Sequence, residues 1–228
     1  FYASSRTQSK RTRCTKYTRA FSVTRVTKDV FNPTTDHEQL RETVRSFVDD
    51  KVRPQALEND KTETFNVDLF RELGKLELLG LTAQEEYGGS AMDASAVALV
   101  HEELSAADPG FCLAYLAHSL LFVHNLAVNG NEEQKKKYLP KACTGEYIGG
   151  MCMSEPAVGT DVLGMKTKAV KGEDGSYVLN GTKMWITNGS VDGKNTGDVF
   201  LVYARTGEGP RDFSLFLVEK DDEGFSLG

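Results

Sequence analysis

The hydrophobic period of the chain changes near residue 147, and this change limits the possible folds more than any other feature. Between residues 35 and 139, apolar residues recur every three or four positions, the spacing of one helix face. From Tyr147 onward, β-branched and apolar residues alternate with polar ones, the spacing of half-buried strands. Helices followed by strands predict an α+β fold, with an all-helical domain over 34–145 and an antiparallel β-barrel or sandwich over 146–228.

Five helices are expected in the first half. Asn66 and Asn131 can cap two of them through their side-chain oxygens, and Pro54 is expected to end the first. The fourth is apolar nearly all round, so we expect it to be the buried central helix. The expected helices span residues 35–53, 67–79, 93–106, 111–128 and 132–138.

Six strands are expected in the second half, with a tight turn at Glu173-Asp174-Gly175-Ser176 between two of them. No Gly-x-Gly-x-x-Gly follows a strand, so a Rossmann dinucleotide site is not supported. The expected strands span residues 147–154, 166–171, 177–179, 183–186, 199–205 and 213–219.

Charge is unevenly distributed. Residues 1–28 contain eight basic residues, no acidic residue and many Ser and Thr, a composition typical of an organellar transit peptide. The segment Arg19-Ala20-Phe21-Ser22 is similar to a matrix-processing site cleaved before Ser22; a basic disordered tail is the alternative. The remainder contains 19 basic and 33 acidic residues, which disfavours a nucleic-acid partner because phosphate contacts need clustered Lys and Arg. The transit-like composition of residues 1–28 leads us to expect a mitochondrial matrix protein.

The spacing of cysteines, histidines and apolar residues predicts no metal site, disulfide framework or membrane span. The four cysteines are far apart, with no Cys-x-x-Cys pair, and the four histidines lack metal-ligand spacing. The longest apolar stretch, around 111–126, is interrupted by His118, Ser119, His124 and Asn125, so no membrane span is expected.

Two segments have the composition of a ligand site. The first, Met151–Asp161, begins as a strand and ends as a loop in which Pro156 and Gly159 leave backbone N–H groups and small hydroxyls free for a planar, polar-edged ligand. The alternative for this segment is a surface turn capped by Ser154 and Asp161.

The second segment, Lys183–Gly189, holds the only tryptophan of the chain, Trp185, two residues before Thr187. Residues i and i+2 of a strand face the same side, so an indole and a hydroxyl would line one surface that suits a flat heteroaromatic ring. The alternative is a core tryptophan with a cross-strand threonine.

Three segments in this order resemble the acyl-CoA dehydrogenase family: Met153–Asp161, Leu179–Lys183 and Trp185–Gly189. They follow a helical half with Tyr87-Gly88-Gly89 and Gly130–Pro140, and the resemblance covers about residues 36–228. Within the family, Ala117-His118-Ser119 and Val128–Glu132 look most like the branch that acts on isovaleryl-CoA.

The resemblance implies FAD as cofactor and α,β-dehydrogenation of an acyl-CoA as the reaction. It implies flavin contacts that are spread over both segments, from Met151, Met153, Ser154, Thr160, Trp185, Ile186 and Thr187. Thr160 would also contact the CoA portion of the substrate. Trp185 would cover the ring face opposite the substrate, and Thr187 would hydrogen-bond near flavin N5, which takes the hydride.

Arg211 aligns with a family position near the CoA chain. Its neighbour is Pro210, where the family commonly has a serine that supplies a hydroxyl. The alternative for Arg211 is a solvated loop arginine.

The family's base is a glutamate on a C-terminal helical domain that we expect to be absent from this chain, so no catalytic residue is assigned. The resemblance further implies electron-transferring flavoprotein as electron acceptor and a homotetramer. The alternative to an enzyme is a non-catalytic subunit or assembly partner. Other short or branched acyl-CoA substrates share the flavin motifs.

Overall fold

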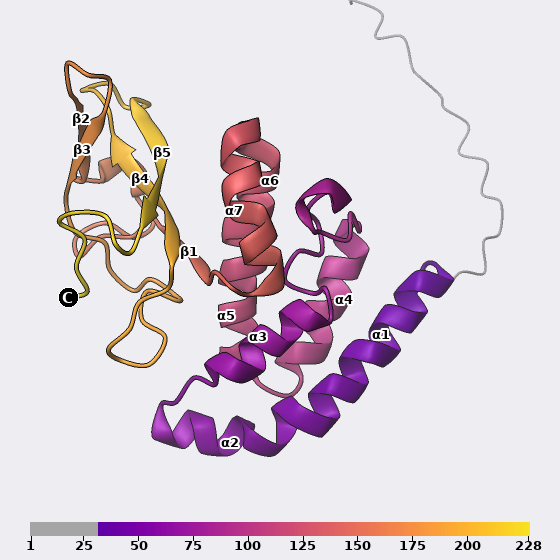
Figure 1. The fold of residues 1–228 in the computed structure, drawn as a ribbon. Helices are drawn as coiled ribbons and strands as arrows, with labels where there is room; N and C mark the ends of the chain where they lie inside the picture. Colours follow the sequence, from indigo (N-terminus) through magenta and orange to yellow (C-terminus); the bar gives the residue numbers. More distant parts are fainter. Residues whose placement is uncertain (1–31) are drawn as a thin grey trace, which may run out of the picture.

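A computed structural model describes residues 32–228, and Figure 1 shows a helical domain with a β-sheet on one side of it. The predicted transit peptide, residues 1–28, lies outside the described residues. Helices fill the chain from Thr35 to Thr144, and the first strand begins at Gly149, so the change of hydrophobic period marks the change of architecture.

The helical domain contains seven α-helices, two π-helical segments (η1, η3) and a short 3₁₀ helix (η2). Asn66 and Asn131 cap α3 and α7 as predicted: Asn66 Oδ1 accepts from the Leu69 N–H at 2.9 Å, and Asn131 and Gln134 bond reciprocally. The elements are α1 Thr35–Phe47, η1 Val48–Val52, α2 Arg53–Thr62, α3 Val67–Lys75, η2 Glu85–Tyr87, α4 Ala94–Ser105, α5 Pro109–Leu116, η3 Ala117–His124, α6 Asn125–Asn129 and α7 Glu132–Thr144.

The prediction that Pro54 ends the first helix is wrong. The π-helical turn η1 changes the hydrogen-bond partners ahead of Pro54, which then lies in the first turn of α2, where a proline is tolerated. Similarly, α7 continues past the predicted end at Tyr138, through Pro140, and stops at Gly145, whose φ of 78° is left-handed.

The predicted central helix is confirmed. Elements α5, η3 and α6 form one helical run, Pro109–Asn129, which by length and composition alone could cross a membrane. However, 61% of its most apolar window is buried inside the protein, and the fully buried Tyr115 donates a hydrogen bond to the Leu78 carbonyl at 3.0 Å. The run is therefore the core helix of the domain, longer and more continuous than the polar interruptions in its sequence indicate.

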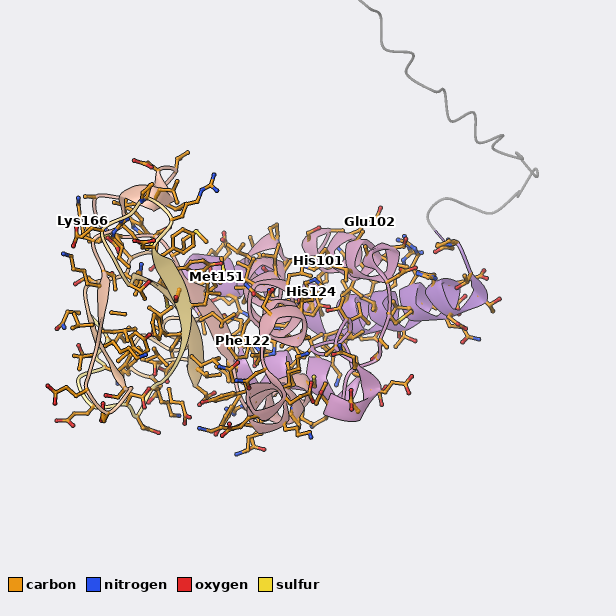
Figure 2. The ribbon with its side chains drawn as sticks, turned by 90° about the horizontal axis from the view of Figure 1, so that it is seen from above. His101, Glu102, Phe122, His124, Met151 and Lys166 are labelled. Atoms are coloured by element: carbon orange, nitrogen blue, oxygen red, sulfur yellow. The ribbon has the colours of Figure 1, made fainter. Side chains whose placement is uncertain are left out.

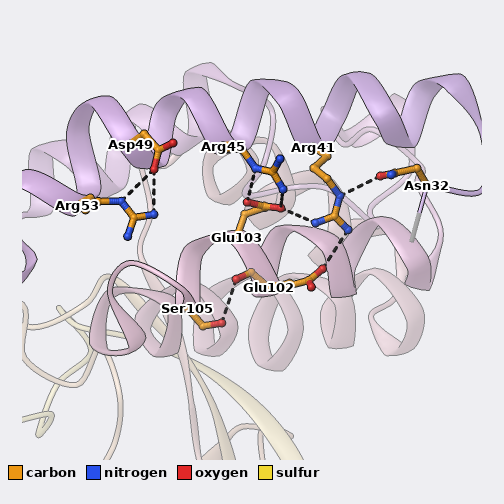
Figure 3. Close-up of polar contacts among 8 residues, drawn as sticks. All are labelled: Asn32, Arg41, Arg45, Asp49, Arg53, Glu102, Glu103 and Ser105. Carbon is orange, nitrogen blue, oxygen red and sulfur yellow. Dashed lines mark hydrogen bonds and ion pairs between the residues drawn. The ribbon is translucent and has the colours of Figure 1, made fainter. Parts of the chain in front are cut away.

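Helix α1 lies on the side of the helical domain away from the sheet and is joined to α4 by ion pairs (Figures 1 and 3). The Glu103 carboxylate accepts from Arg45 at 2.7 and 3.0 Å and also from Arg41. Arg41 bonds in addition to the more exposed Glu102 at 3.0 Å. The Glu103 and Arg41 side chains are only 10% and 12% exposed, so this pair is the buried part of the contact, whereas Arg45 and Glu102 are 57% and 58% exposed.

The β-domain is one five-stranded sheet that is mixed, and the prediction of an antiparallel domain is therefore only half right. β4 pairs with β5 and β2 with β3 in antiparallel fashion, but β1 and β2 both run parallel to β4. Among the described residues, the strands do not close into a barrel. The strands are β1 Gly149–Cys152, β2 Lys168–Lys171, β3 Tyr177–Asn180, β4 Val199–Arg205 and β5 Phe213–Glu219, and a 3₁₀ turn, η4 Val162–Gly164, precedes β2.

β4 is covered on both faces. Val199 and Leu201 pack against the helical domain, in a cluster that includes Phe122. On the other face, Phe200 and Val202 pack with a second group of apolar side chains that includes Leu179, Ile186, Val218 and Phe225. The sheet is further tied to α7 where Glu219 accepts from Lys137 at 2.6 Å and from Tyr138 at 2.8 Å.

Candidate functional site

The end of β1 and the loop after it hold the first group of predicted site residues. Met151 faces the helical domain and packs against the cluster that contains Phe122 (Figure 2). Met153 and Ser154 follow and are half-buried like Met151. The loop then folds back on itself, because Glu155 and Val158 exchange two backbone hydrogen bonds of 2.8 and 3.0 Å.

β1 lies close to the central helix because Gly149 has no side chain. A Cβ atom at Gly149 would lie 2.2 Å from the Phe122 ring. His118 then joins the two elements: its Nδ1 accepts from the Gly149 N–H at 2.9 Å, and its Nε2 donates to the Ala142 carbonyl at 3.0 Å. A neutral imidazole with its proton on Nε2 satisfies both bonds. Gly149 and His118 thus fix the position of Met151 relative to the helices.

Burial lowers the pKa of His118 to about 4, since the charged form would lose its hydration. An unfolded histidine takes up a proton near pH 6.5, so between pH 6.5 and pH 4 the unfolded state binds more protons than the folded state. The free energy of unfolding therefore decreases as the pH is lowered through that window. We expect it to decrease by about 2 kcal/mol from pH 7 to pH 5. His118→Gln, which keeps one acceptor and one donor, should remove this dependence in urea-unfolding series.

The matched control is His124→Gln, at an exposed histidine of the same π-helical segment. It should retain the wild-type dependence on pH. An unchanged slope in His118→Gln would show that His118 is not the group that titrates.

The second predicted segment runs beside the first. The Met184 N–H donates to the Ser154 carbonyl at 3.0 Å, and the Thr187 carbonyl lies 2.9 Å from the position of a Cβ atom at Gly150. Downstream, the buried Asn188 side chain donates to the carbonyls of Ala114 and Gly149 at 3.1 and 3.0 Å. The structure therefore brings the backbones of both segments together in one wall, although Met151 packs toward the helical domain and Ile186 packs on the other face of β4.

The prediction of a strand at 183–186 is wrong. Trp185 and Asn188 have left-handed φ values of 57° and 65°, which a strand cannot include, because the contacts of Met184 and Asn188 determine the backbone on either side. Strand alternation therefore cannot place Trp185 and Thr187 on one face. Trp185 is also not a core residue, because its side chain is 74% exposed.

The polar groups of this wall fit a planar ligand with polar edges. Within residues 32–228, the hydroxyls of Ser154, Thr160 and Thr187 make no hydrogen bond, and the Thr187 N–H has no backbone partner. Trp185 adds an open indole face, and Ile186 and Thr187 are half-buried beside it. Free donors next to an exposed aromatic plane are the groups that bind a flavin ring at its edge and face.

Thr160 and Arg211 are both exposed, on two loops at one end of the sheet. Arg205, the last residue of β4, links these loops by donating to the Leu163 carbonyl at 3.0 Å and to the Gly209 carbonyl. Thr160 and Arg211 do not contact each other in the described part of the chain.

Sequence analysis missed the group that holds the wall together. Glu155 is buried and forms an ion pair with Lys183 at 2.9 Å, and Asn188 anchors the other end of the segment. Lys183 is partly buried within an otherwise exposed stretch, and no sequence signal pairs it with Glu155.

One cavity lies away from this wall. It has a volume of about 590 Å³ and is formed by the turn between α2 and α3, the 191–198 loop and Lys220. None of the predicted site residues lines it. The part of the chain that the structure describes also contains no group of three His, Cys, Asp or Glu residues arranged for a metal ion.

Comparison with known proteins identifies the family of both domains. Residues 34–146 match the N-terminal domain of acyl-CoA dehydrogenases, and residues 150–228 match their middle domain. The mitochondrial isovaleryl-CoA dehydrogenase of Pongo abelii is 42% identical over 214 residues, 91% of this chain and 49% of that protein. The chain thus spans about half the length of the curated relatives it matches.

Solved structures give the same result. A glutaryl-CoA dehydrogenase from Mycobacterium smegmatis in complex with FADH2 is 35% identical, with a TM-score of 0.77 over 85% of this chain and 47% of that chain. A structure described as electron transferring flavoprotein of Acidaminococcus fermentans is 34% identical, with a TM-score of 0.80 over 87% of this chain and 51% of that chain. The chain belongs to the acyl-CoA dehydrogenase family of FAD-dependent oxidoreductases and contains the N-terminal and middle domains of that family.

Proposed function

We propose that this chain forms part of a FAD-dependent acyl-CoA dehydrogenase that converts isovaleryl-CoA to 3-methylcrotonyl-CoA in leucine catabolism. The observation that carries the proposal is the wall formed by β1 and residues 183–189, where an exposed indole lies beside hydroxyls without partners. The similarity to isovaleryl-CoA dehydrogenases supports the substrate. Electron-transferring flavoprotein as acceptor and the mitochondrial matrix are part of the same proposal, supported by the names of the relatives. A homotetramer is also part of it and rests on the family resemblance alone.

In this proposal FAD, when bound, supplies the group that accepts a hydride from the β-carbon of the substrate. Met151, Met153 and Ser154 would hold the ring from the strand end, and Trp185 and Ile186 would exclude water from it. Thr187 would donate a hydrogen bond to the ring edge near N5. Thr160 would lie between the ring and the CoA portion of the substrate, and Arg211 would lie near the CoA chain. The described residues include no assigned base for the α-proton.

An anaerobic titration with isovaleryl-CoA tests the reaction in the protein made from its natural gene. We expect the visible flavin absorption to bleach, with smaller effects from butyryl-CoA and glutaryl-CoA at equal concentration. Bleaching by another acyl-CoA alone would reassign the substrate. No bleaching by any of the three, in a protein that holds FAD, would support a non-catalytic relative instead.

Thr187→Val is expected to weaken FAD binding about five- to tenfold, because it removes one directed hydrogen bond to the ring while keeping the shape of the side chain. Equilibrium dialysis of the apoprotein against FAD measures the effect. Thr182→Val is the matched control, since it makes the same change on an exposed residue directly before the segment. Equal affinities for the two variants would contradict the role of Thr187.

A further inference from the structure

The buried carboxylate of Glu155 is a junction between three segments. Its own backbone closes the loop after β1 by bonding to Val158. Its side chain accepts from the backbone N–H groups of Lys166 and Thr167 at 2.6 and 3.0 Å, at the start of β2, and from Lys183 Nζ at 2.9 Å. The residue is 4% exposed, so these bonds replace nearly all of its hydration.

Lys183 completes the junction from the other side. Its side chain is 9% exposed, and its ammonium donates to Glu155 and also to the Met153 carbonyl at 3.1 Å. The next residue, Met184, donates its N–H to the Ser154 carbonyl at 3.0 Å. Two consecutive residues of one segment therefore bond to the two residues at the end of β1 that are proposed to contact the flavin.

The charge state of this junction is fixed. Burial alone would raise the pKa of Glu155, but hydrogen bonds from Thr167, Lys166 and Lys183 outweigh it and lower the pKa to about 2. The carboxylate is thus ionised at every pH at which the protein would work. Its charge is compensated by an ammonium that comes from the same segment as Trp185.

Trp185 lies between two anchors as a result. Lys183 and Met184 hold the backbone before it, and Asn188 holds the backbone after it. Its left-handed φ of 57° is an uncommon conformation for an aromatic residue and persists only if the surroundings enforce it. The anchor at Lys183 is the one that depends on a charge pair.

We propose that Glu155 and Lys183 are positioning residues for the flavin ring: their ion pair sets the separation between the Met153-Ser154 strand end and the Trp185–Thr187 segment, and so controls the stacking of Trp185 on the ring. This inference rests on the proposed function, because it requires a flavin at this wall. Neither residue touches the ring. Each acts through the backbone that it holds.

The test is a titration of the apoprotein, as made from its natural gene, with FAD, followed by tryptophan emission. Each variant is measured with and without Trp185→Phe, so that the difference reports the quenching of Trp185 by the bound ring. Lys183→Met should weaken FAD binding at least tenfold and remove most of the quenching of Trp185. Lys183→Arg, which restores the charge, should bind FAD within threefold of wild type and recover the quenching.

Lys220→Met is the matched control. Lys220 also pairs with a carboxylate in the β-domain, Asp198 at 2.8 Å, but its side chain is 42% exposed and it lies beside the start of β1, not beside the strand end that Lys183 holds. It should leave FAD affinity and Trp185 quenching unchanged. All titrations are run well below the melting temperature of each variant, which is measured by circular dichroism.

If Lys183→Met does not fold, the double variant Glu155→Gln with Lys183→Met serves instead, because it leaves no unpaired buried charge. It should still bind FAD at least fivefold more weakly than wild type. Unchanged affinity and quenching in the folded single or double variant would show that the pair only stabilises the fold and would overturn the positioning role while leaving the proposed function intact. A wild-type protein that binds no FAD would overturn both.

Discussion

Glu103→Gln is expected to destabilise the protein by about 3 kcal/mol, at the low end of the cost of removing one partner from a buried ion pair. Glu103 accepts from both Arg45 and Arg41, and the Arg41 side chain is only 12% exposed (Figure 3). The neutral amide would leave that guanidinium largely desolvated with less compensating charge. Urea unfolding followed by circular dichroism measures the difference.

Glu102→Gln is the matched control for this prediction. It makes the same chemical change one residue earlier, on a side chain that is 58% exposed and bonds to the same Arg41. Exposed ion pairs contribute little to stability, so we expect Glu102→Gln to lower the free energy of unfolding by at most about 1 kcal/mol. Similar losses for Glu102→Gln and Glu103→Gln would mean that burial does not decide the effect.

The effect of Glu103→Gln on the free energy of unfolding should also depend on pH. Hydrogen bonds from Arg45 and then Arg41 lower the pKa of Glu103, against the opposing effect of burial. Its ionised form therefore stabilises the fold above the pKa of an unfolded glutamate, about 4.3, and this contribution is lost as the pH falls through the lowered native value. The gap between wild type and Glu103→Gln should thus narrow below about pH 4.

Gly149→Ala is the second variant with a large expected effect, a decrease of about 3 kcal/mol in the free energy of unfolding. The added Cβ atom would lie 2.2 Å from a ring carbon of Phe122, which is fully buried, so either the ring or β1 has to move. Movement of β1 would also shift Met151. Reduced FAD binding should therefore accompany the loss of stability.

A double-mutant cycle with Phe122→Leu checks the cause. The smaller side chain removes the clash, so the double variant should be more stable than the sum of the single effects predicts, by about 1 kcal/mol or more. Gly159→Ala is the control, because nothing lies within 4 Å of the position of its Cβ atom. Additive effects at residues 149 and 122 would refute the steric explanation.

Local signals in the sequence predict the elements they encode. The alternation over Val199–Arg205 and Phe213–Glu219 predicts both strands to the residue, and Asn66 and Asn131 mark two helix starts. These features depend on side-chain spacing and on hydrogen bonds within a few residues. The helical and sheet-containing halves of the fold follow from them.

Distant contacts explain the errors. Residues 183–186 contain Trp and Ile, which favour strands, but the bonds of Met184 to Ser154 and of Asn188 to Ala114 and Gly149 impose a left-handed turn. The parallel pairing of β1 with β4 could not be predicted from the sequence either, because the antiparallel expectation considers only strands that are neighbours in sequence. The composition of the candidate wall was therefore predictable, but its anchors were not.

The pairing of β1 with β4 has a consequence for synthesis on the ribosome. Ile148 and Asp198, which flank that pairing, are bonded to each other although they are 50 residues apart in sequence. Because the ribosome adds ~5–20 residues per second, β4 emerges several seconds after β1. During this interval the helical domain can fold while the surface around Phe122 stays uncovered. A nascent chain stalled between the two strands should therefore be the form most prone to aggregate and most dependent on chaperones.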